Sequence, residues 1–356
     1  MKKVILLLII LAVFTTNVLA KDTNFAFYPQ FSYSDETGFM AGIISYFRFR
    51  LDNFPTEIPK QDITTNVVYS AKKQFAFRFM PILYSRDGLY QLEAKFDYDY
   101  WPTEFFGVGN KVYDIEPEDY TPQKINFDLR LKRRIKNNWH VLALGEYFNS
   151  RLVKTEVGGE LEKKEILGSE SYHLVGIGSG LVYDSRSSTS YPISGGIMDF
   201  SFKVYNKALG SDYNFLQFDL FGSKFVSLDS KQVLAFTART VLTNRNAPFQ
   251  KLPHLGMYMR AYNDTRFIDQ KLINFRTEYR AFPWSGKFFD RIGFVLFLDA
   301  GQTVAQINDF SLSDMKCSYG IGLRFSVFTD DRFNLRLDFG FCKDDSNFEI
   351  SGGEAF

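Results

Sequence analysis

The chain has 356 residues with 42 basic and 41 acidic side chains, and its formal net charge is +1, which does not favour binding to nucleic acid. Aromatic residues make up 17% of the chain, so it is not a disordered segment. Three histidines and two cysteines are too few for a disulfide scaffold or a zinc module.

The first twenty residues have the pattern of a secretory signal peptide. Lys2 and Lys3 precede an apolar run over residues 4–14, and Ala20 ends a short stretch of the kind that signal peptidase cleaves. We therefore expect residues 1–20 to direct export through the Sec pathway and residues 21–356 to form the mature domain. No later stretch reaches the ~18 continuous apolar residues of a transmembrane helix.

Polar and apolar residues alternate along much of the mature chain. Between Lys124 and Lys136 the even positions are polar and most odd positions are apolar. A period of two is typical of a β-strand with one polar and one apolar face. The alternating segments are about ten to thirteen residues long, which is the length of a strand that crosses a bilayer at a tilt. Strands of a β-sandwich are usually shorter.

These observations predict an all-β fold, a single 16-stranded antiparallel transmembrane β-barrel with a charged lumen. The predicted strands are 24–34, 38–50, 62–71, 74–85, 89–101, 123–136, 139–150, 171–184, 195–205, 213–226, 231–242, 271–282, 291–303, 316–328, 332–342 and 346–356. An even number of strands places both ends of the barrel on the periplasmic side. The longest connections, 102–122, 151–170 and 243–270, then face the outside, and most of the short turns face the periplasm.

Several segments resemble the BamA/TamA superfamily of outer-membrane assembly factors, also called the bacterial surface antigen family. Residues 252–262 are similar to the sixth loop of that family, and residues 277–280 and 297–301 to the two strands that follow it. Further similar segments are 105–110, 183–186, the Tyr-Pro-x-x-Gly turn at 191–196, and 353–356.

The resemblance implies that loop 243–270 folds into the lumen and that Arg260 pairs there with Glu278 and Asp299. Alternation independently assigns Glu278 to the lumen face, whereas Asp299 lies in a strand that is apolar on both faces, which suits a wall covered by a packed loop. We call these three residues the latch.

The tip of the loop departs from the family. It reads Met259-Arg260-Ala261-Tyr262, where the family has Val-Arg-Gly-Phe. Ala261 must therefore adopt the backbone conformation of a glycine, at a steric cost if its φ is positive. Phe356 resembles the C-terminal signal by which barrel proteins are recognised for their own assembly, and a terminal aromatic also suits a membrane girdle.

The resemblance also implies a function, the insertion or translocation of outer-membrane components. The expected partners are outer-membrane lipids, together with unfolded outer-membrane proteins or a separate periplasmic POTRA-type protein, because the first strand begins too soon after the cleavage site for a POTRA domain in this chain. A passive channel or lipid and solute conduit, and a surface-displayed antigen or adhesin, remain open as alternatives.

We expect no enzyme, no catalytic residue, no cofactor and no metal site. Of the three histidines, His140, His173 and His254, only His173 lies near serines, at positions 169 and 171. Cys317 and Cys342 fall at the outward ends of neighbouring predicted strands but on opposite faces, which leaves a disulfide between them open.

Overall fold

The structure is a computed structural model that describes residues 20–34, 37–112, 116–286, 288–328, 332–343 and 346–356. Residues 1–19 of the expected signal peptide lie outside the described residues, so the signal peptide stays a prediction. None of the helices in the described ranges is long and apolar enough to cross a membrane.

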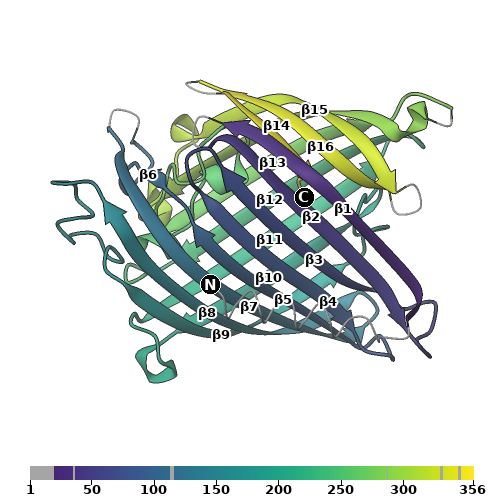
Figure 1. The fold of residues 1–356 in the computed structure, drawn as a ribbon, viewed down its shortest axis with the longest axis horizontal. Coiled ribbons are helices and arrows are strands. Elements are labelled where there is room, and N and C mark those ends of the chain that lie inside the picture. Colours follow the sequence, from purple (N-terminus) through teal and green to yellow (C-terminus); the bar gives the residue numbers. More distant parts are fainter. Residues whose placement is uncertain (1–19, 35–36, 113–115, 287, 329–331, 344–345) are drawn as a thin grey trace.

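The described strands form one antiparallel sheet that curls into a nearly closed barrel of 16 strands, which confirms the predicted fold (Figure 1). The strands are β1 Ala20–Ser34, β2 Gly38–Leu51, β3 Gln61–Ser70, β4 Phe75–Tyr84, β5 Tyr90–Tyr100, β6 Thr103–Phe105, β7 Glu118–Lys136, β8 Trp139–Thr155, β9 Tyr172–Asp184, β10 Gly195–Tyr205, β11 Phe215–Ser227, β12 Gln232–Thr243, β13 Lys271–Ala281, β14 Ile292–Val304, β15 Lys316–Phe328, β16 Phe333–Cys342 and β17 Ser346–Gly352. Short 3-10 turns are η2 Lys207–Leu209, η3 Phe249–Lys251, η4 Gly256–Tyr258, η5 Phe289–Arg291, η6 Ile307–Asp309 and η7 Leu312–Asp314. The three-residue β6 pairs with β7 beyond the end of β5, and β5 itself pairs directly with β7, so β6 adds no strand to the wall.

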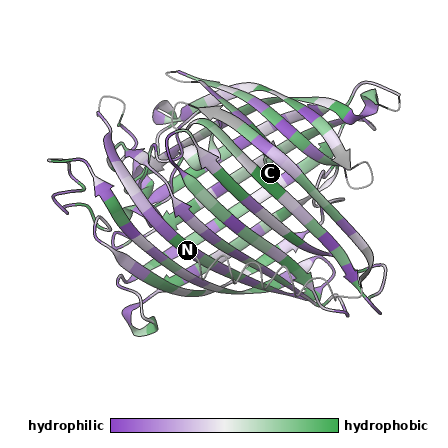
Figure 2. Cartoon of the chain, in the orientation of Figure 1, coloured by the Kyte–Doolittle hydropathy of each residue, from purple (hydrophilic) through white to green (hydrophobic). Residues whose placement is uncertain are grey.

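Side chains alternate between the two surfaces of the wall. On β7, Phe127 and Leu131 are exposed on the outer surface, whereas Arg130 between them pairs on the lumen side with Asp199 of β10 at 2.5 Å. The same alternation of apolar and polar residues along the strands is visible in Figure 2. An apolar outer face and a charged inner face are what a barrel in a bilayer requires.

Among the strands that are longer than predicted, β7 and β8 extend furthest. The strands β7 and β8 have 19 and 17 residues, and their pairing continues to Tyr120 and Thr155. The hairpin can extend beyond the bilayer because an antiparallel ladder satisfies its own backbone hydrogen bonds in water or lipid. The connections predicted at 102–122 and 151–170 are correspondingly shorter.

The last strand is shorter than predicted, because β17 ends at Gly352 and not at residue 356. Gly353 has a φ of 82°, a left-handed conformation that glycine adopts readily, and the chain turns there into the lumen. Continuing the strand would have placed Glu354 on the same outer face as Phe348. A carboxylate facing lipid is costly, so the turn inward at Gly353 is the favourable path.

The barrel closes weakly between its first and last strands. On one side β1 pairs with β2 along its whole length, from Ala20 opposite Leu51 to Ser34 opposite Gly38. On the other side, among the described residues, it pairs with β17 at a single position, Tyr33 opposite Phe348. We call this junction between β1 and β17 the seam; in Figure 1 it lies between the purple and the yellow strands.

Candidate functional site: the lumen loop and its ion pairs

The connection between β12 and β13, which we call the lumen loop (residues 244–270), carries the predicted site. Much of it is apolar and buried: Phe249, Leu255, Phe267 and Ile268 are at most 1% exposed. Its backbone folds back on itself, since the amide of Leu255 donates to the carbonyl of Phe267 at 3.0 Å. These buried side chains and backbone bonds give the loop a defined shape against the inner faces of the strands.

Arg260 lies at the tip of the lumen loop and meets both predicted carboxylates. Its Nε and Nη2 donate to the two oxygens of Asp299 at 2.9 and 2.6 Å, and its Nη1 donates to Oε1 of Glu278. The guanidinium also lies 3.6 Å from the ring centroid of Phe297. A bidentate pair shared with a second carboxylate holds both the position and the orientation of the arginine.

Burial decides the strength of this arrangement. The side chains of Glu278 and Asp299 are fully buried and that of Arg260 is 7% exposed. A charge taken out of water is costly unless it is paired and hydrogen-bonded, so each of the three requires the others. The apolar inner face of β14 is explained by the same contact, because Phe297 is covered by the loop tip.

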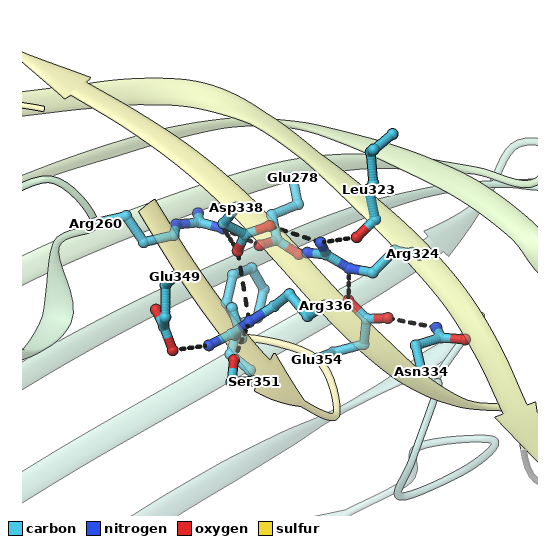
Figure 3. Close-up of polar contacts among 12 residues, drawn as sticks. Arg260, Glu278, Leu323, Arg324, Asn334, Arg336, Asp338, Glu349, Ser351 and Glu354 are labelled. Carbon is cyan, nitrogen blue, oxygen red and sulfur yellow. Dashed lines mark hydrogen bonds and ion pairs between the residues drawn. The ribbon is translucent and has the colours of Figure 1, made fainter. Parts of the chain in front are cut away.

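The latch belongs to a larger buried network that the sequence did not reveal (Figure 3). Asp338 of β16 lies 3.6 Å from Arg260 and accepts a 2.6 Å hydrogen bond from Arg324 of β15. Arg324 donates in turn to Glu354 at 3.0 Å. Arg280 pairs with Glu278 at 2.8 Å. Charges on four strands and on the segment after β17 therefore share one set of ion pairs.

The loop tip needs two backbone adaptations. Ala261 has a φ of 88°, the left-handed conformation that was expected to carry a steric cost. On β16, Gly340 leaves the space for this turn, because a Cβ at that position would lie 3.1 Å from both the Cβ and the amide nitrogen of Ala261. The close approach of the loop to the wall therefore depends on a residue that lies outside the loop.

The flanking residues of the motif are packing residues. Met259 is 2% exposed in an apolar cluster with Leu255 and Phe267. Tyr262 packs edge-on against Phe267 at 5.4 Å, and its hydroxyl donates to the carbonyl of Cys317 at 3.2 Å. Both side chains fix the loop on either side of Arg260.

A second anchor holds the first half of the lumen loop to the opposite wall. The Nζ of Lys251 pairs with Glu146 of β8 and lies 4.0 Å from the ring centroid of Phe148. Glu146 also accepts from Lys203 and, at 2.7 Å, from the hydroxyl of Tyr205, and its side chain is 2% exposed. No sequence signal indicated this contact, because a lysine in a loop and a glutamate in a strand are individually unremarkable.

The other residues singled out from the sequence lie apart from this network. His173 is exposed and pairs with Asp212 at 3.0 Å, whereas the hydroxyl of Ser169 donates to the carbonyl of Ile166. Across the described part of the chain, no hydrogen bond joins His173 to a serine. Cys317 and Cys342 are not joined by a disulfide, and the thiol of Cys342 donates to the carbonyl of Ala261 at 3.7 Å.

Phe356 lies inside the barrel, which contradicts the girdle interpretation. It packs against a buried cluster that includes Tyr191, Phe225 and Phe282, and its carbonyl accepts from Arg280 at 3.1 Å. Tyr191 comes from the predicted turn at 191–196, so that turn contributes a side chain to the short-turn end of the lumen. The role of Phe356 as an assembly signal stays a prediction.

The fold and the lumen network together define a class, the outer-membrane β-barrels with a loop held inside the lumen. The family model described as the Omp85 superfamily domain matches residues 84–356, so the chain belongs to that superfamily. This confirms the resemblance to the BamA/TamA assembly factors and implies residence in the outer membrane.

Solved structures share the fold at low sequence identity. The chain is similar to BamA from Haemophilus ducreyi lacking POTRA domains 1–3, with a TM-score of 0.60 and 16% identity over 93% of this chain and 70% of that one. It is also similar to CdiB from Acinetobacter baumannii (0.58, 13%) and CdiB from Escherichia coli (0.59, 10%), with 93% of this chain covered in each case. The chain spans 60% and 61% of those two proteins. No curated protein matches the sequence.

Proposed function

We propose that this barrel inserts or translocates other outer-membrane components and that the seam is where it does so. The single observation that carries the proposal is the contrast at β1, which within the described part of the chain is paired along its length on one edge and at one position on the other. An unpaired strand edge in hydrocarbon is costly and is a template for an incoming strand. An unfolded barrel protein supplies such strands by β-augmentation.

The lumen loop supports the same function. It is anchored at Glu146 on one wall and at Glu278 and Asp299 on the other, so it crosses the lumen. A lumen that is blocked by the loop leaves the seam as the route for the substrate and preserves the permeability barrier of the membrane. In this proposal the chain is exported through the Sec pathway and receives substrate from a separate periplasmic POTRA-type partner.

Locking the seam tests the proposal. Tyr33→Cys with Phe348→Cys joins the paired position by a disulfide, in a background without the native cysteines. Vesicles containing the purified protein are mixed with an unfolded outer-membrane barrel protein, and protease protection reports its insertion. We expect insertion into vesicles with the oxidised variant to be as slow as insertion into protein-free vesicles. Reduction of the disulfide should restore the faster rate.

The matched control joins two neighbouring strands that are already fully paired. Ser45 lies opposite Thr65 in the ladder of β2 and β3, so Ser45→Cys with Thr65→Cys adds a disulfide without closing the seam. This variant should be active in both redox states. An oxidised seam variant as active as this control would contradict the proposal.

One observation favours a conduit as the second candidate. A cavity of about 440 Å³ lies in the lumen, lined by charged residues of both signs that include Lys95, Asp128, Arg130, Asp219 and Arg239. Charged walls are typical of a water-filled passage. The conductance of the protein distinguishes a passage that is open from one that the loop blocks.

A further inference from the structure

A group of exposed basic side chains lies at the short-turn end of the barrel. Arg133, Arg134 and Lys136 are consecutive or nearly consecutive at the end of β7, and all three are exposed. Arg86 is exposed on the turn between β4 and β5. This turn lies beside the end of β7, because the amide of Arg134 donates to the carbonyl of Leu89 at 2.8 Å. We call these four residues the basic rim.

The basic rim forms no ion pairs with the part of the protein that the structure describes. Among the described residues, no acidic side chain lies within ion-pair distance of any of the four. Asp87, the acidic residue of the same turn, feels the charge of Arg134 but forms no ion pair with it, and accepts hydrogen bonds from the hydroxyl of Ser85 at 2.5 Å and the amide of Leu89 at 3.0 Å. Four positive charges that form no ion pair within the described ranges favour an anionic ligand from outside.

Basic residues elsewhere at this end of the barrel are used internally. Arg186 forms a two-bond pair with Asp184 at 2.7 and 3.0 Å. Arg50 donates to two backbone carbonyls, and Lys231 donates to carbonyls and a hydroxyl in the turn before β14. The basic rim differs from these residues because its four side chains are exposed and, among the described residues, donate no such hydrogen bond.

The position of Arg133 on the lipid-facing side of the wall indicates that the anionic ligand is a component of the membrane. Arg133 belongs to the outward-facing row of β7, after Leu131 and before Ile135, which are 38% and 59% exposed. Its guanidinium lies 5.8 Å from the ring centroid of Tyr90 on β5. A cation in a lipid-facing row, beside an aromatic ring, lies at the depth of lipid headgroups, where arginine and aromatic side chains are favourable.

Aromatic side chains on the neighbouring strands mark the same depth. Trp139 is 37% exposed, follows Lys136 across the turn and is its partner in the ladder. Its ring packs against Tyr183 of β9 at a centroid distance of 5.0 Å. Trp and Tyr side chains on the outer surface of a barrel are typical of a membrane interface. The interface that Trp139 and Tyr183 mark is the one at the periplasmic end of the barrel.

We propose that the basic rim is a binding site for the phosphate group of an anionic phospholipid in the inner leaflet. Arg133 and Lys136 contact the headgroup from the wall, Arg86 and Arg134 add positive charge from the turn, and Ile135 and Trp139 lie against the glycerol and upper acyl chains. Clustered basic residues next to a membrane recognise anionic lipids in this way. The site does not depend on the proposed assembly function, because it requires only that the barrel lies in a bilayer.

Fluorescence of Trp139 tests the proposal directly. The chain has three tryptophans, and Trp101→Phe with Trp284→Phe leaves Trp139 as the only one. The protein is reconstituted in phosphatidylcholine vesicles with a minor share of brominated phosphatidylglycerol or brominated phosphatidylcholine, and quenching gives the relative association of the two lipids. We expect the anionic lipid to be preferred by at least about fivefold, which is the contribution of one basic residue near a membrane surface.

The variant Arg133→Gln with Lys136→Gln should bring that preference close to one. Its matched control is Arg151→Gln with Lys154→Gln, two exposed basic residues at the other end of β8, and the preference should be unchanged in it. If the first variant fails to fold, the unsubstituted protein still tests the site, since raising the salt concentration to ~1 M shortens the screening length to ~3 Å and should reduce the preference.

Equal quenching by the two lipids would overturn the proposal, and so would a preference that the two double variants lower equally. A preference that persists in ~1 M salt would also contradict it. Inorganic phosphate is added at constant ionic strength to separate the two sources of the phosphate group. Displacement of the lipid by millimolar phosphate would assign the site to soluble phosphate and overturn the assignment to a lipid, whereas no displacement supports it.

Discussion

Removing the guanidinium of Arg260 should release the lumen loop. In Arg260→Ala the side chains of Glu278 and Asp299, both fully buried, lose the cation that joins them. Loss of one member of a buried ion pair costs about 3–5 kcal/mol. The lower figure applies here because Arg280 still pairs with Glu278 at 2.8 Å and Arg276 lies 3.4 Å from Asp299. A change of about 3 kcal/mol shifts the equilibrium between docked and released loop by more than 100-fold.

Planar-bilayer conductance measures this shift, because a released loop opens the lumen. We expect small, fluctuating conductance from the unsubstituted protein and larger, longer-lived openings from Arg260→Ala. Arg260→Lys keeps the charge without the bidentate geometry and should be intermediate. Arg245→Ala removes an exposed arginine from the same loop and should leave the traces unchanged. Large, steady conductance that is identical in all four proteins would refute the reasoning and favour the passive conduit.

The same recordings test three smaller perturbations. Lys251→Met should raise the open fraction about tenfold, less than Arg260→Ala, because Glu146 keeps two other partners in Lys203 and Tyr205. Ala261→Gly should lower the open fraction several-fold, because it removes about 1 kcal/mol of strain at a φ of 88°. Burial lowers the pKa of His254 from 6.5 to about 4, so the docked loop holds this ring neutral while a released loop takes up a proton below about 6.5. Docking of the loop is thus fully stable above pH ~6.5 and weakens as the pH falls toward 4. The open fraction should therefore rise about 30-fold between pH 7.5 and 5 in the native protein, and much less in His254→Asn.

The strands were predictable because the membrane imposes a strict local rule. A wall with lipid on one side and water on the other gives every strand a period of two, and the pattern between Lys124 and Lys136 carries it without long-range information. The extension of β7 and β8 was not predicted, because outside the bilayer neither face has to be apolar. The ladder alone determines where those strands end.

The site was predictable only where a motif carried it. Arg260, Glu278 and Asp299 were identified by resemblance, and alternation supported Glu278 alone. The contact of Lys251 with Glu146 joins residues far apart in sequence, and the inner face of β8 around Glu146 is largely apolar. Nothing in a local pattern specifies which of many lumen charges will meet, since pairing depends on how a loop crosses the barrel.

The segment after β17 connects the latch with the seam. If β17 continued in the register set by Tyr33 and Phe348, Phe356 would come opposite Phe25 and four further residues, 353–356, would lie along the seam. The chain instead turns inward, where Glu354 pairs with Arg324, an arginine that also bonds Asp338 beside Arg260.

The lumen network and the seam therefore compete for the same four residues, 353–356. If Arg324 and Arg280 lost these partners, their buried positive charges would be less well compensated. If the edge of β1 has no neighbour, its backbone groups are left without hydrogen-bond partners from a strand. In the structure the lumen charges are paired, and among the described residues the seam is paired at one position. Charge pairing inside the lumen therefore favours the inward turn of residues 353–356 and limits the length over which β17 can run beside β1.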